Sequence, residues 1–211
     1  MRAMRLLKVN TVDDIRRVAT LIKDIVKSGG LIIYPTDTVY GLGADPFNVD
    51  AVKKVFHVKR RQSKPLPVLA SRLEHIFKIC DFDERALTLA EAFWPGPLTI
   101  VVKKKETLPS IVTAGRNTVG VRIPNHEIAR EIIEICGGLL IGTSANISGH
   151  SPPKSAEEAI RELGSLVDIV IDSGSAPLGI PSTIVDLTVD PPIIRREGII
   201  KAKDVLRVLR K

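Results

Sequence analysis

A short polar tract follows a strand-like apolar run near the beginning of the sequence. Residues 31–34 are apolar, and they lead into Pro35-Thr36-Asp37-Thr38-Val39-Tyr40-Gly41-Leu42-Gly43. Hydroxyl and carboxylate groups at the end of a strand can orient a ligand, and the two glycines allow a ligand to approach the backbone closely. Thr36 and Asp37 can equally satisfy backbone groups in a plain turn. The tract alone therefore leaves a ligand site and an ordinary turn open.

Three cationic residues, Lys59, Arg61 and Lys64, follow the end of a predicted short helix. Such a group can neutralise a triphosphate, and it can also be a solvated basic turn. Lys59 and Arg61 are expected to be exposed. Because the sequence contains no GxxxxGK[ST] motif, any nucleotide must be bound without a P-loop.

Further polar residues stand within or just after apolar strands. Arg122 interrupts an apolar run, so it must face water or a fixed anion, and a bound carboxylate is the favoured explanation. Ser144 and Asn146 flank Ala145, so their side chains can point the same way and suit a phosphate and a ribose. An Asx-type turn explains the same pair equally well.

Two sites near the C-terminal end are more ambiguous. Ser182 follows Ile180-Pro181, and Arg195-Arg196 end the last predicted strand. These residues are either site residues or an ordinary turn hydroxyl and surface charges. The four histidines and two cysteines show neither the spacing of a metal site nor that of a Ser/His/Asp triad, and Cys80 and Cys136 are expected to be buried.

The elements that must position these residues alternate along the chain. Periodicity and capping residues predict helices over 11–28, from 48 onward, and over 83–93, 125–136, 155–163 and 205–209. Thr11, Asn48 and Asn125 are the expected N-caps, and Ser155 with Glu158 is a capping box. Apolar runs predict strands over 31–34, 66–70, 98–102, 119–123, 139–142, 167–171, 183–187 and 193–195. The result is a mixed α/β sheet whose polar strand ends converge in one crevice.

Composition is typical of a globular protein. The 211 residues are 44% hydrophobic and 26% charged, and no segment separates two regions of different composition, which predicts one domain over 1–211 with a core of about 10–200. The absence of an apolar run of roughly 18 residues and of a signal-peptide core predicts a cytoplasmic protein without membrane contact. A net charge of +7 favours a polyanionic partner such as a nucleotide, pyrophosphate or RNA. Aromatic residues at 4% weigh against stacking on unpaired bases.

Together these segments resemble the YrdC family over roughly residues 10–200. The resemblance is carried by residues 35–43, by Lys59-Arg60-Arg61, and by Trp94-Pro95-Gly96-Pro97-Leu98-Thr99, Val121-Arg122-Ile123-Pro124, Ser144-Ala145-Asn146 and Pro181-Ser182-Thr183. It implies a single-domain α/β fold, a twisted mixed sheet flanked by helices, with a basic concave cleft. It also implies a nucleotidyltransferase that makes threonylcarbamoyl-AMP and pyrophosphate from L-threonine, bicarbonate or carbon dioxide, and ATP carrying Mg²⁺. That is the first step of threonylcarbamoyladenosine modification of tRNA.

The same resemblance implies roles for individual residues. It assigns catalysis to Lys59 and Arg61. It assigns ATP binding to Arg61, Lys64, Thr118, Ser144, Asn146 and Arg196. It assigns threonine binding to Thr38, Arg122, Gly142 and Ser182. No metal ligand from the protein is implied. The chain departs from the family in being one residue shorter between Arg61 and Lys64, in carrying Leu69 where some members have a histidine, and in lacking the C-terminal domain of the long form.

Two rival functions stay open at this stage. One is a module that binds double-stranded RNA or tRNA through a basic concave face, and its binding should survive alanine substitution of Arg122, Ser144 and Asn146. The other is a domain that forms a carbamoyl adenylate. For the synthase, the implied partners are a tRNA threonylcarbamoyl transferase, which takes over the product, and tRNA itself.

Overall fold

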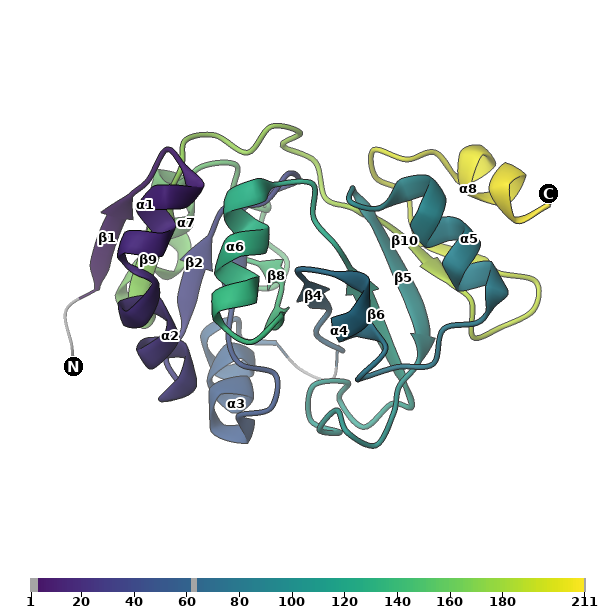
Figure 1. The fold of residues 1–211 in the computed structure, drawn as a ribbon, viewed down its shortest axis with the longest axis horizontal. Helices are drawn as coiled ribbons and strands as arrows, with labels where there is room; N and C mark the ends of the chain where they lie inside the picture. Colours follow the sequence, from purple (N-terminus) through teal and green to yellow (C-terminus); the bar gives the residue numbers. More distant parts are fainter. Residues whose placement is uncertain (1–3, 62–63, 211) are drawn as a thin grey trace.

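The computed structural model describes residues 4–61 and 64–210, and their strands form two mixed sheets (Figure 1). The first sheet has the order β1-β9-β2-β3-β8, with bounds Arg5–Lys8, Ile169–Asp172, Ile32–Tyr34, Gly41–Gly43 and Thr143–Ser144. β9 pairs in parallel with β1 and β2, whereas β3 is antiparallel to β2 and β8. The sequence predicted the α/β class correctly, but it did not show that the strands divide between two sheets.

The second sheet has the order β11-β10-β5-β6-β4-β7. Its strands are β11 (Ile193–Arg196), β10 (Thr183–Asp186), β5 (Leu98–Lys103), β6 (Thr118–Arg122), β4 (Val68–Ala70) and β7 (Leu139–Ile141). β10 with β5 and β4 with β6 are parallel pairs, and the other neighbours are antiparallel. Residues far apart in the sequence thereby meet on one face of the sheet.

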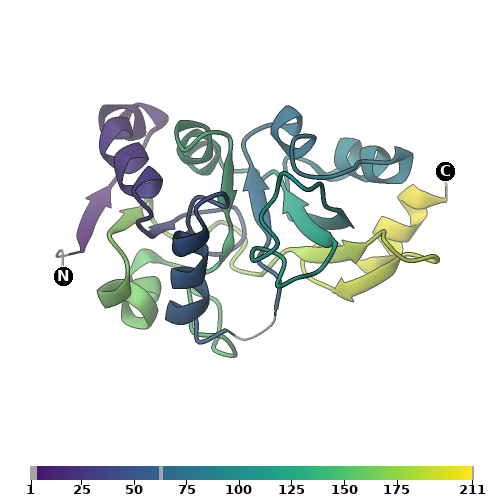
Figure 2. The same cartoon turned by 90° about the horizontal axis from the view of Figure 1, so that it is seen from below.

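Helices cover both sheets. They are α1 (Val12–Arg17), α2 (Ala19–Lys27), α3 (Val49–Val58), α4 (Leu73–Ile76), α5 (Glu84–Phe93), α6 (Glu127–Ile135), α7 (Ala156–Leu163) and α8 (Ala202–Leu209), with a 3₁₀ turn at Gly164–Leu166. α6 packs on α1 and α2 as well as on β4 and β7, so it connects the two sheets. Figure 2 shows α7 on the opposite side of the first sheet from α1 and α2.

Most predicted helix starts are confirmed by their caps. Thr11 and Asp14 form a capping box, and Asn48, Asp83 and Ser155 each accept a hydrogen bond from the third residue of the helix that follows. Asn125 was the wrong cap for α6, because Nδ1 of His126 accepts the bond from Ala129 N at 3.2 Å. An imidazole can fill this position because its unprotonated nitrogen is an acceptor.

The predicted helix over 11–28 is two helices in the structure. Val18, with φ −108° and ψ 11°, leaves the helical region between α1 and α2, although apolar residues keep their spacing across the break. The short strands β1 and β3 were not predicted. Glycine is a poor strand former, yet β3 requires it, since a Cβ at Gly43 would lie 2.9 Å from Leu140 and Tyr34 side-chain atoms.

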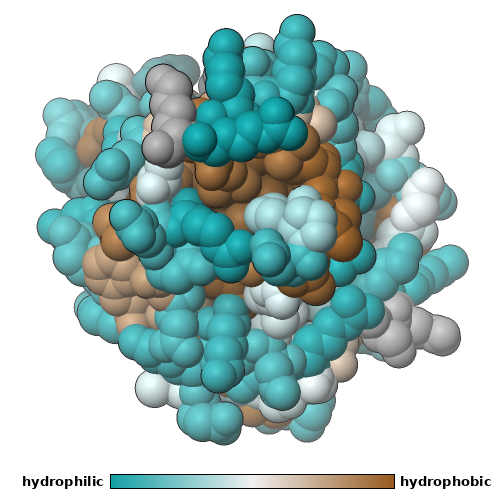
Figure 3. Space-filling model, turned by 90° about the vertical axis from the view of Figure 1, so that its right-hand side faces the viewer, coloured by the Kyte–Doolittle hydropathy of each residue, from teal (hydrophilic) through white to brown (hydrophobic). Residues whose placement is uncertain are grey.

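The larger apolar cluster extends across both sheets. It includes Ile33 of β2, Ile100 of β5 and Val55 of α3, and partly buried residues of β11 and α8 pack against it. Figure 3 views the end of the molecule that carries α8 and α5, where apolar side chains gather in one area bordered by polar ones. Cys80 and Cys136 are buried free thiols, as predicted. None of the helices in residues 4–61 and 64–210 combines the length and apolar character needed to cross a bilayer.

Candidate active site

A pocket of about 610 Å³ lies over the second sheet. Its floor is formed by every second residue of three neighbouring strands and of the segment leading into them, because side chains alternate between the two faces of a sheet. These residues are Ser182, Ile184 and Asp186 before and along β10, Thr99 and Val101 of β5, and Thr118, Gly120 and Arg122 of β6. The register of the pairs β10/β5 and β5/β6 brings these alternate residues side by side.

The walls of the pocket come from the polar tract, from the segment after α3 and from the β7–β8 connection. Nine of the eleven residues that the sequence placed in the site line the pocket, namely Thr38, Arg61, Lys64, Thr118, Arg122, Gly142, Ser144, Ser182 and Arg196. The predicted convergence of strand ends in one crevice is therefore seen for these nine. Lys59 and Asn146 are not among the lining residues.

Lys59 is buried, whereas the sequence predicted an exposed residue. Its side chain is among the fully buried ones, with 1% of the residue accessible. Nζ donates hydrogen bonds to the backbone oxygens of Ser144 and Asn146, the latter at 2.7 Å. Burial lowers the pKa of Lys59 to about 7, helped by the charge of Arg61. Lys59 therefore holds the Ser144 segment, and it is not among the residues that line the pocket.

Asn146 is likewise turned into the protein. Its residue is 4% accessible, and Nδ2 donates to the backbone oxygens of Ile147 and His150 at 3.0 and 2.7 Å. Ala145 is fully buried, as the alternation predicted, but only Ser144 of the two flanking polar residues lines the pocket. The turn explanation of Asn146 is therefore the one that its hydrogen bonds support.

The polar tract forms both a turn and a wall of the pocket. Thr36 Oγ1 donates to Val39 O at 2.6 Å and accepts from Thr38 N at 3.2 Å, which stabilises the turn. Thr38 Oγ1 accepts a hydrogen bond from Arg122 Nη1 at 3.0 Å. The tract therefore forms the turn that the sequence allowed, and both threonines also line the pocket.

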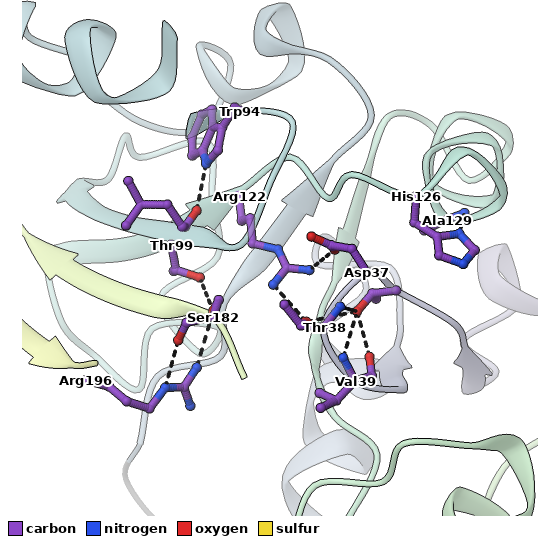
Figure 4. Close-up of polar contacts among 12 residues, drawn as sticks. Asp37, Thr38, Val39, Trp94, Thr99, Arg122, His126, Ala129, Ser182 and Arg196 are labelled. Atoms are coloured by element: carbon purple, nitrogen blue, oxygen red, sulfur yellow. Dashed lines mark hydrogen bonds and ion pairs between the residues drawn. The ribbon is translucent and has the colours of Figure 1, made fainter. Parts of the chain in front are cut away.

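Arg122 extends from β6 toward this tract (Figure 4) and is 4% exposed. The anion beside it comes from the protein itself, since Nη2 donates to Asp37 Oδ1 at 2.6 Å. Burial lowers the pKa of Arg122, and Asp37 opposes that shift; a guanidinium nevertheless stays charged. Among the described residues, neither Nε of Arg122 nor Oδ2 of Asp37 has a hydrogen-bond partner. Arg122 thus lines the pocket with one buried N–H of its guanidinium left without an acceptor among the described residues.

Arg196 and Arg61 bring further positive charge to the pocket. Arg196 donates to Ser182 O at 3.0 Å and to Ser182 Oγ at 3.3 Å, and Ser182 Oγ lies 2.8 Å from Thr99 Oγ1. Arg61 donates to the carbonyls of residues 64 and 65. Burial lowers the pKa of both arginines. The charge of Arg196 lowers the pKa of Arg61 further, and the charge of Arg122 lowers the pKa of Arg196 further. Cations that repel one another in one pocket favour binding of a polyanion.

Arg116 and Asp186 also line the pocket, although no sequence motif indicated them, and so does Arg195, whose sequence context fitted a site residue and a surface charge equally well. Arg195 pairs with Asp186 Oδ2 at 2.9 Å. The register of β10 and β11 shifts between Ile184 and Val185, so Arg195 and its neighbour Arg196 both reach the pocket. In a strand without this bulge, only one of two consecutive arginines would point to the pocket. No pattern in the sequence predicted the bulge.

Gly142 is required by its close contact with Leu69. A Cβ at position 142 would lie 2.2 Å from Leu69 Cγ. Gly142→Ala is therefore expected to lower the free energy of unfolding by about 1–3 kcal/mol, measured by urea denaturation. In a chain that also carries Leu69→Ala the clash is absent, so the added cost of Gly142→Ala should fall to well below 1 kcal/mol. An equal cost in both backgrounds would contradict this explanation.

Comparison with known proteins shows which family this chain resembles. The Sua5/YciO/YrdC family model, described as "Telomere recombination", matches residues 24–198. The threonylcarbamoyl-AMP synthase of Pyrococcus abyssi is 38% identical over 186 residues, which are 87% of this chain and 55% of that protein. A putative threonylcarbamoyl-AMP synthase of Methanocaldococcus jannaschii is 37% identical over 193 residues, 91% of each chain.

A solved structure supports the same relationship. The crystal structure of P. abyssi Sua5 complexed with L-threonine superposes with a TM-score of 0.89 at 36% identity, covering 97% of this chain and 60% of that one. The chain thus spans little more than half of the P. abyssi protein and most of the M. jannaschii one. Because the family model and these relatives match most of its length, the chain belongs to the Sua5/YciO/YrdC family.

Proposed function

We propose that this chain is a nucleotidyltransferase that forms threonylcarbamoyl-AMP from L-threonine, bicarbonate or carbon dioxide, and ATP. The observation that carries the proposal is that Arg61, Arg122 and Arg196 line one pocket. This arrangement suits a polyphosphate next to an amino-acid carboxylate. The names of the two relatives, and the threonine bound to the P. abyssi protein, support the same substrates.

The proposed reaction needs charge neutralisation and positioning. The amine of threonine attacks carbon dioxide, forms an N–C bond and loses a proton, which gives an N-carboxylate. An oxygen of that carboxylate then attacks the α-phosphorus of ATP, and the bond to the leaving pyrophosphate breaks. Arg122 would hold the threonine carboxylate, with Thr38 and Ser182 near its hydroxyl, while Arg61, Lys64 and Arg196 would offset the charge of the phosphates. Such a transfer proceeds without a nucleophilic side chain.

Mg²⁺ would be bound mainly by the nucleotide. No group of three histidine, cysteine, aspartate or glutamate residues within 4–61 and 64–210 is arranged to hold a metal ion. The carboxylate that lines the pocket, Asp186, already accepts hydrogen bonds from Arg195 and Thr188. When bound, the ion would supply further neutralisation of the phosphate oxygens.

The proposed product is a mixed anhydride of a carbamic acid and a phosphate. It would be consumed by a tRNA threonylcarbamoyl transferase in the cytoplasm, and the positive charge of the chain is compatible with direct tRNA contact. The proposal predicts that the pocket residues are needed for the adenylate even when no tRNA is present.

Arg61 and its neighbour Arg60 provide a matched test of phosphate binding. Arg61 lines the pocket, whereas Arg60 is exposed and does not. Arg61→Ala is expected to lower kcat/KM for ATP by about 100-fold, because a charge-assisted contact to phosphate is lost. Arg60→Ala should stay within about twofold of the wild type. Steady-state release of pyrophosphate measures both, and equal losses in the two variants would refute the assignment of Arg61.

A further inference from the structure

The positive charge around the pocket is distributed unevenly. Arg61 donates to backbone carbonyls, and Arg196 donates to the carbonyl and hydroxyl of Ser182, so both keep their full charge. Arg122 instead contacts the carboxylate of Asp37 at 2.6 Å. Figure 4 shows that Asp37 and Ser182 lie on different sides of Arg122. The pocket therefore has an uncompensated cationic part and, at Arg122, a part whose net charge is close to zero.

Burial makes the charge of Asp37 effective at this point. The side chains of Asp37 and Arg122 are each 4% exposed, and bulk water screens such a pair only weakly. Oδ2 of Asp37 has no hydrogen-bond partner among the described residues, so its charge is not offset by a second donor. The backbone oxygen of Asp37 accepts from Leu178 N at 2.9 Å, which helps to fix the carboxylate in place.

We propose that Asp37 is a specificity-determining residue that keeps phosphate groups away from Arg122 and reserves this arginine for the carboxylate of a net-neutral amino acid. A phosphate that reached the guanidinium of Arg122 would bring up to two negative charges close to Asp37, and like charges at short range repel one another strongly. An amino-acid carboxylate brings one negative charge, and the remainder of the amino acid is not anionic. The inference rests on the proposed function, because it concerns how one pocket separates threonine from ATP.

The test measures whether inorganic phosphate competes with L-threonine. Threonine binding to the full chain is titrated calorimetrically at several phosphate concentrations, with ionic strength held constant by chloride. In the wild type and in Asp37→Glu, which keeps the charge, phosphate should leave the apparent Kd for threonine unchanged within about twofold. In Asp37→Asn, where the charge is gone, phosphate should raise that Kd by about tenfold or more.

Asp45→Asn is the matched control. Asp45 is also buried and bound to a cation, Lys27 at 2.9 Å, but Lys27 does not line the pocket, whereas Arg122, the partner of Asp37, does. It should therefore show the wild-type response to phosphate. A similar phosphate response in Asp45→Asn and Asp37→Asn would overturn the inference, since it would reflect general loss of a buried carboxylate.

The wild type alone can also overturn the inference, so a poorly folded Asp37→Asn does not decide the matter. Displacement of threonine by phosphate from the wild-type protein would show that Asp37 does not exclude phosphate. Threonine binding that is insensitive to phosphate in Asp37→Asn as well would contradict the role of the charge while leaving the proposed function intact. A wild type that binds ATP but no threonine would contradict the proposed function itself.

Discussion

Replacing Arg122 by methionine is expected to abolish threonine-dependent pyrophosphate release and to lower the free energy of unfolding by about 3–5 kcal/mol. The first effect follows because Arg122 lines the pocket and is the cation proposed to hold the threonine carboxylate. The second follows because Asp37 would be left buried and charged without its partner at 2.6 Å. Pyrophosphate release and urea denaturation measure the two effects separately.

A double variant separates the stability effect from the functional one. In Asp37→Asn/Arg122→Met both charges of the buried pair are gone, so much of the lost stability should return. Threonine-dependent release should stay absent, because the neutral pair offers no cation to the substrate carboxylate. Recovery of the reaction in the double variant would mean that Arg122 is needed only to neutralise Asp37.

Lys59→Met is expected to lower both stability and activity. The methionine keeps an apolar stem in the buried site but removes the donor for the backbone oxygens of Ser144 and Asn146. Asn146 O would lose this donor, while Ser144 O would keep the hydrogen bond from Asn146 N at 2.9 Å. We expect a cost of about 1–3 kcal/mol, which corresponds to a decrease in Tm of roughly 3–10 °C. Because Ser144 lines the pocket, displacement of its backbone should also weaken ATP-dependent turnover.

Lys64→Met is the control for charge at the same segment. Lys64 is exposed and lines the pocket, so its replacement should affect ATP binding while leaving Tm within about 1 °C. A Lys59→Met protein with unchanged Tm and reduced turnover would restore the original expectation of an exposed, ligand-facing lysine. Differential scanning calorimetry and pyrophosphate release distinguish the two cases.

The stabilisation that Lys59 contributes should also depend on pH. Burial lowers the pKa of Lys59 from 10.5 to about 7, so between these values the unfolded chain binds more protons than the folded protein. The free energy of unfolding of the wild type should therefore rise with pH in this window, relative to Lys59→Met. The difference between the two proteins should be larger at about pH 9 than at about pH 6. A difference that is constant or shrinks with pH would contradict the buried, desolvated amine.

The sequence predicted most helix and strand positions, because apolar periodicity carries this information locally. Nine of the eleven residues that it placed in a site line one pocket, while their roles stay predictions. Asn48, Asp83 and Ser155 cap the helices that the pattern placed after them. The division of the strands between two sheets could not be predicted in this way, since it depends on pairing between residues far apart in the chain, such as β1 with β9.

The errors within the site have a common physical origin. A lysine beside arginines normally suggests a solvated charge, but Lys59 has two backbone acceptors within the protein that only the folded structure brings to it. Arg122 was correctly identified as needing an anion, while the identity of that anion, Asp37, required the distance between two segments 85 positions apart. Motifs therefore identified most of the residues that gather at the pocket, and tertiary contacts determined which of them line it.

The proposed synthase activity can be measured as pyrophosphate release from purified protein with ATP, Mg²⁺ and bicarbonate, with and without L-threonine, followed by mass detection of the adenylate. We expect release that depends on threonine, a product with the mass of threonylcarbamoyl-AMP, and loss of both in Arg122→Met. Folded protein that binds ATP but releases no pyrophosphate with threonine, or releases it equally without threonine, would refute the synthase activity.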